Sequence, residues 1–108
     1  MLQEQELRQR FIRVERAIGE AAQACSAERN LPSELRDCIQ KLDRQSDAAR
    51  QAVEACDEAG IRKMVGALEL LGDRAKRVCS SVTTLTPQMK SAVKHVHDEL
   101  SELKHELH

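Results

Sequence analysis

The sequence predicts an all-α protein, an antiparallel four-helix bundle, and three observations support this fold class. Of the 108 residues, 41% are hydrophobic and 32% are charged, and Ala, Leu, Glu, Arg, Gln and Lys dominate, as they do in long helices. Apolar residues recur at alternating steps of three and four, the heptad spacing of coiled coils and packed helices. Two prolines interrupt this spacing, and the four glycines leave few turns for a sheet. The length suits one domain over residues 1–108.

The first helix is predicted from about residue 2 to residue 29. Its apolar seam runs from Leu7 and Phe11 to Cys25, and charged residues cover its other face. Ile12 is the one large apolar residue that lies clearly off this seam. Pro32 cannot continue the preceding turn and is suited to the first turn of the next helix, so it separates the first two helices.

The second helix has a seam that begins with Leu35 and Leu42, narrows to small side chains in the middle, and ends near Cys56. The seam loses its phase over residues 56–61, where Gly60 is the candidate for a left-handed C-terminal cap. We therefore predict a turn between two helices here. The alternative is one long central helix from residue 33 to about residue 81, which gives three helices in all.

The third helix is predicted from Ile61 onward, and a Leu-Thr-Pro turn at residues 85–87 ends it. Thr86 is placed to cap the fourth helix, with Pro87 at its first position. Shifting the sequence by 54 residues aligns the seams of the two halves and places Cys25 on Cys79. This agreement favours two similar helical hairpins.

Four residues form a candidate metal site. In an alternating bundle, Cys25, Cys38 and Cys79 fall near the same end, with His95 one turn further along the last helix. Thiolate and imidazole ligands suit zinc or copper. However, the C-x-x-C spacing of familiar metal sites is absent, and buried cysteines also serve as small apolar side chains in narrow layers. We therefore expect packing rather than a cofactor, and keep the metal site as the alternative.

Composition also excludes several classes of function. The formal net charge is −1 and the only aromatic residue is one Phe, so we expect no nucleic-acid partner despite the arginines at positions 8, 10, 13 and 16. The charged N-terminus resembles no signal peptide, and no apolar run is long enough to cross a bilayer, so we expect a cytoplasmic protein without membrane contact. Phosphate loops and hydrolase or metalloprotease motifs are absent, which argues against an enzyme.

These patterns predict a small helical interaction or adaptor module with an unknown protein partner, and they favour self-association. Ile12 and Leu70 are apolar residues that the seams do not use, which makes them candidates for a homodimer contact. The alternative function is a thiol-based metal or redox sensor that uses the clustered cysteines.

Overall fold

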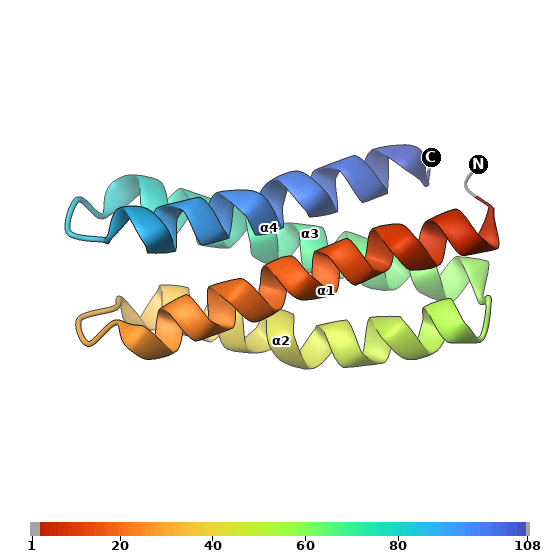
Figure 1. Ribbon diagram of the computed structural model, residues 1–108, viewed down its shortest axis with the longest axis horizontal. Coiled ribbons are helices and arrows are strands. Elements are labelled where there is room, and N and C mark those ends of the chain that lie inside the picture. Colours follow the sequence, from red (N-terminus) through yellow and green to blue (C-terminus); the bar gives the residue numbers. More distant parts are fainter. Residues whose placement is uncertain (1–2, 108) are drawn as a thin grey trace.

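The computed structural model describes residues 3–107 and folds them into four helices. These are α1 (Glu4–Ala27), α2 (Ser33–Glu54), α3 (Glu58–Ser81) and α4 (Pro87–Glu106). They run alternately up and down a body of 41 × 20 × 18 Å (Figure 1). Each helix packs against two neighbours, α1 and α3 each against α2 and α4, and the diagonal pairs do not touch. The predicted antiparallel four-helix bundle is confirmed, and the alternative with one long central helix is wrong.

The core follows the predicted seams. Side chains such as Leu35, Leu42, Leu68 and Leu100 are completely buried and belong to one continuous apolar cluster that all four helices share. Ser46 is the only buried polar side chain among the described residues, and its hydroxyl donates to the Asp43 carbonyl oxygen over 2.8 Å. Because this bond stays within α2, Ser46 fills a narrow layer at little cost in unsatisfied polarity.

The two halves of the chain form hairpins of matching dimensions, as predicted. Helix α3 begins and ends 54 residues after α1, and α4 begins 54 residues after α2. The buried positions follow the same shift, since Cys25 corresponds to Cys79 and Val53 to Leu107. The two hairpins therefore present equivalent faces to each other, which explains why the bundle closes with short loops.

The turn between α2 and α3 is a Schellman motif built without glycine. The amide of Asp57 donates to the carbonyl of Ala52, and the amide of Cys56 donates to the carbonyl of Val53, each over 3.1 Å. Cys56 takes the left-handed conformation that this motif requires, with φ of 55°. Asp57 then caps α3, because its carboxylate accepts from the amide of Gly60 over 3.1 Å.

This geometry corrects one detail of the predicted turn. The turn lies within residues 56–61, but Gly60 does not supply the left-handed cap, because it is already part of the first turn of α3. A β-carbon at residue 60 would lie 2.4 Å from the Asp57 carboxylate, so this glycine makes room for the N-terminal cap. The pattern of apolar residues located the break, whereas the identity of the left-handed residue depended on capping bonds.

Replacing Cys56 by glycine is expected to stabilise the protein by about 1 kcal/mol, because glycine adopts the left-handed conformation without the steric cost that a β-carbon imposes. Equilibrium urea unfolding at fixed chain concentration measures this change. The control Cys56→Val should lower the free energy of unfolding, because a β-branched side chain fits this conformation poorly. A Cys56→Gly variant less stable than the natural chain would contradict the assignment of strain to this residue.

Glycine is structurally required at one place inside the bundle. A β-carbon on Gly72 of α3 would lie 3.2 Å from Cδ1 of the buried Leu100 on α4. A β-carbon on Gly19 or Gly66 would meet no heavy atom within 4 Å. Gly72 therefore permits the close approach of α3 and α4, while the other two helical glycines have no such role.

Candidate functional site

The three cysteines of the predicted metal site are separate core residues. Cys25, Cys38 and Cys79 are all buried near the end of the bundle that holds the α1–α2 and α3–α4 loops. Cys79 lines a groove between α3 and α4, whereas His95 lines the groove between α1 and α4. Among residues 3–107, no three His, Cys, Asp or Glu side chains are placed to hold a metal ion. The structure therefore does not bring Cys25, Cys38, Cys79 and His95 together as a ligand set.

His95 has carboxylate neighbours instead of thiols. Its ring nitrogens lie 3.5 Å from Glu20 of α1 and 3.6 Å from Glu99 of α4. The ring is about half exposed, so these contacts are solvated surface pairs of small energetic weight. His95 thus belongs to the polar surface between α1 and α4.

The thiols are in environments that keep them protonated. Burial raises the pKa of Cys25, Cys38 and Cys79, and it outweighs nearby cations such as Lys90 beside Cys79. Cys56 is exposed, but hydrogen bonding with the Glu4 carboxylate raises its pKa as well. Because the thiolate is the reactive and metal-binding form, these surroundings favour the less reactive thiol at all four positions.

The arginines of α1 do not form a free basic surface. Arg8 pairs with Glu4 over 2.9 Å within the helix. Arg10 reaches across to α4 and contacts Glu102 and Glu106, each over 2.7 Å. The Arg10 guanidinium lowers the pKa of Glu102 through this hydrogen bond. Two of the four arginines are therefore engaged in ion pairs, and Arg10 links α1 to α4.

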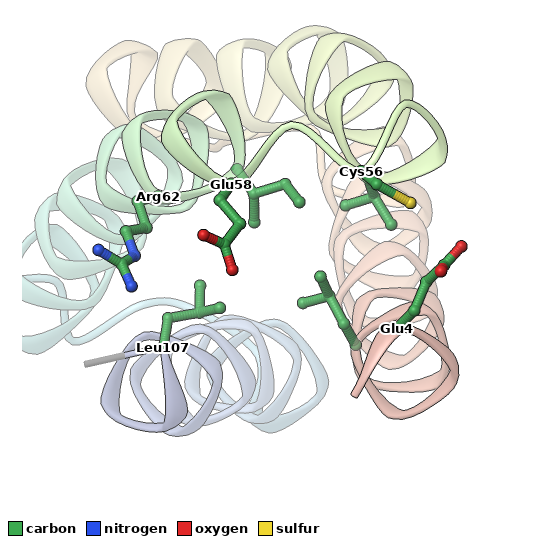
Figure 2. Close-up of a pocket in the computed structure, with 8 residues that line it drawn as sticks. Glu4, Cys56, Glu58, Arg62 and Leu107 are labelled. Carbon is green, nitrogen blue, oxygen red and sulfur yellow. The ribbon is translucent and has the colours of Figure 1, made fainter. Parts of the chain in front are cut away.

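A hollow of about 170 Å³ opens at the end of the bundle where α1 begins and α4 ends. The seam residues Leu7, Val53, Ile61 and Leu107 contribute its apolar lining. Figure 2 shows the Glu58 side chain directed into this hollow beside Arg62, while Cys56 and Glu4 lie at its rim. No sequence motif indicated this site, because its residues come from three helices and one turn.

Ile12 lies on a ridge between two hollows on the outer surface of the bundle. One hollow lies along α1, and Arg13 and Arg16 line it together with Ile12. The other lies between α1 and α2, where the buried side chains of Phe11 and Val53 contribute to its lining. The rim of this second hollow carries two cations and two carboxylates: Arg8, Arg50, Glu15 and Glu54.

Both apolar residues that the sequence left unused are exposed, as predicted. Ile12 is 46% exposed and Leu70 is 68% exposed. They lie on α1 and α3, which are diagonal partners that do not touch. Their outward faces point away from the bundle in different directions, so they do not form one patch.

These features define the chain as a four-helix bundle with an exposed isoleucine, Ile12, on α1. No protein-family model, curated protein or solved structure matches the chain. Within residues 3–107, none of the helices combines the length and apolar character needed to cross a membrane.

Proposed function

We propose that this chain is a helical interaction module that forms a homodimer through the α1–α2 face, with Ile12 at its centre. The observation that carries the proposal is the pairing of an exposed apolar side chain with an adjacent apolar hollow on the same face. In a two-fold dimer, each Ile12 inserts into the hollow of the other copy. This arrangement satisfies the self-complementarity that a two-fold interface requires.

The charges around the hollow favour a second copy over a strongly charged partner. The rim contains equal numbers of cations and carboxylates, and Arg50 already pairs with Glu15 across α1 and α2. Two such rims facing each other can exchange these pairs without accumulating like charges. A highly acidic or basic partner would find no matching field on this surface.

The face is also large enough for a stable dimer. One long side of the molecule measures 41 by 20 Å, a projected area of roughly 800 Å², so a dimer that covers most of this side buries about as much per partner as a standard-size interface. A central apolar anchor within a polar rim is the usual arrangement of such an interface. The area of the α1–α2 face and its apolar centre within a polar rim are therefore both compatible with a homodimer.

The experiment is sedimentation velocity of the natural chain, Ile12→Glu and Leu70→Glu from about 1 μM to about 500 μM, a range that covers weak homodimers. The natural chain should dimerise. Ile12→Glu should weaken the dimer at least about 100-fold, because it removes the apolar anchor and puts in its place a charge that must lose its water when the copies associate. The monomer should stay folded, since the new carboxylate lies four residues from both Arg8 and Arg16.

Leu70→Glu is the matched control, because Leu70 is the more exposed residue and lies on the opposite corner of the bundle. It should dimerise like the natural chain. Circular dichroism of both variants separates a lost interface from a lost fold. A natural chain that is monomeric at every concentration, or a Leu70→Glu variant that dissociates as Ile12→Glu does, would overturn the proposal.

We also infer a cytoplasmic location, which the chemistry of the cysteines supports. All four are free, and three are buried as thiols in the core. Reduced thiols persist in a cytosolic environment, whereas oxidising compartments favour disulfides in small domains. Secretion of a tagged full-length chain from its own cells would contradict this part of the proposal.

A further inference from the structure

The charge of this protein is unevenly distributed along the chain and in space. Residues 74–97 contain five Lys or Arg and no Asp or Glu, while the remaining residues contain twelve basic and eighteen acidic side chains. The acid-free segment covers the end of α3, the α3–α4 loop and most of α4, which lie side by side at one end of the bundle (Figure 1). A nearly neutral chain therefore has a local excess of basic residues at this end, where Glu28 of the α1–α2 loop, which accepts from Thr86, is an acidic neighbour.

Two helices bring the lysines of this segment to one groove. Lys76 and Ser80 project from α3, and Lys90 and Lys94 project from α4, around a hollow of about 220 Å³. Cys79 and Val93 also line it, and both are buried. No carboxylate lines the groove, whereas the end hollow contains Glu4 and Glu58.

The charges in this groove are largely uncompensated. Lys76 and Lys90 have no ion-pair partner among residues 3–107, and Lys94 pairs only with Asp98 over 2.9 Å at its outer edge. Lys90 and Lys94 are four residues apart on the same helix, a spacing at which like charges destabilise a helix slightly. Further along, Asp73 is occupied by His97 over 2.8 Å. An anion in the groove would relieve this repulsion.

We propose that the groove between Lys76, Ser80, Lys90 and Lys94 binds a small anion with two or more phosphate groups. Ammonium groups are strong phosphate ligands. The Ser80 hydroxyl already donates to the Lys76 carbonyl oxygen over 3.0 Å, so the lysines supply the ligands. The N-terminus of α4 adds little to this field, because the Glu28 carboxylate accepts from the amide and the hydroxyl of Thr86, the N-cap residue of α4. The pocket is thus defined by charge and hydrogen-bond donors from two elements.

A small anion fits this surface better than an extended nucleic acid. The positive groove is short, and the rest of the chain carries an excess of acidic residues that repels a long polyanion. The groove also has no aromatic side chain on which a base could stack. The groove therefore recognises the phosphate groups of its ligand and not a base.

The test uses inorganic tripolyphosphate as the probe, titrated into the full chain while amide NMR shifts are followed. We expect saturable binding with the shifts confined to residues near the α3–α4 loop, and weakening as salt is raised. The double variant Lys76→Gln/Lys90→Gln should bind at least about tenfold more weakly, because two of the charged phosphate ligands are lost. The control Lys41→Gln/Lys63→Gln removes the same net charge from exposed sites elsewhere and should bind like the natural chain.

Three results would overturn this proposal. The first is equal weakening in both double variants, since net charge alone would then explain the binding. The second is a set of NMR shifts centred on Arg13 and Arg16 of α1. The third is tighter binding of a short single-stranded oligonucleotide than of tripolyphosphate. The Ile12→Glu variant should bind tripolyphosphate normally, so a failure of the dimer and a failure of the anion site are distinguishable.

Discussion

Replacing Leu100 by alanine is expected to lower the free energy of unfolding by about 3 kcal/mol, within the range known for completely buried leucines. Leu100 belongs to the apolar core, and its Cδ1 atom lies next to the backbone of Gly72. The loss combines the transfer free energy of the deleted carbons with the cavity that remains. Urea unfolding at fixed chain concentration measures it.

Gly72 provides a second test of the same contact, because it lies against the Leu100 side chain. Gly72→Ala alone should destabilise by about 1 kcal/mol, since the overpacking against Leu100 exceeds the gain in helix propensity. In the double variant the new methyl group enters the cavity that Leu100→Ala leaves. The double variant should therefore lose less stability than the sum of the losses in the two single variants. Gly66→Ala is the control and should stabilise by up to about 1 kcal/mol, because its β-carbon meets nothing. Simple additivity of the Leu100 and Gly72 changes would contradict the close contact.

Replacing Cys38 by serine is expected to lower the free energy of unfolding by about 2 kcal/mol, because a hydroxyl costs more to bury among apolar side chains than a thiol, even where it donates to a carbonyl of its own helix as Ser46 does. Cys38→Ala should cost less, about 1 kcal/mol, because it removes volume but buries no polar group. The exposed Cys56→Ser change should alter stability by less than about 0.5 kcal/mol. Thermal unfolding of the three variants provides the comparison.

The same measurement discriminates between a core cysteine and a metal ligand. If Cys38 is a core residue, a chelator or added zinc leaves the melting temperature of the natural chain unchanged. A ligand would give the opposite result, since metal binding to the folded state raises stability and both substitutions would abolish that gain equally. A zinc-dependent melting temperature lost in both Cys38 variants would restore the metal hypothesis.

Much of the fold was predictable, because helices that pack together have apolar residues at regular intervals in the sequence. The seam positions Phe11, Leu35 and Leu42 were assigned from spacing alone, and all three are buried. The capping role of Thr86 was also predictable, since its hydroxyl accepts from the amide of Met89 over 3.2 Å. These features depend on residues within one helical turn of each other, so local sequence contains the information they need.

The candidate sites were less predictable, because they depend on which neighbour each face meets. The three cysteines were expected near one end of the bundle with His95 one turn further along the last helix, but nearness along the bundle axis does not place side chains in a shared groove. His95 faces α1 while Cys79 faces the groove on the other side of α4. The rotation of each helix about its axis decides which groove a side chain lines. The spacing of apolar residues determines that rotation angle only approximately.

By itself, the sequence determined the all-α class, the four helices, the two proline-marked loops and the matching of the two halves. Short-range periodicity and capping are sufficient for these, since every helix had to bury one seam. Tertiary structure alone decided that Cys56 would take the left-handed turn, that Gly72 would admit Leu100, and that lysines 76, 90 and 94 would share one groove. The Cys56 turn depends on backbone bonds at the end of α2 that the pattern of apolar residues does not specify. The other two outcomes depend on contacts that form only when separate helices meet.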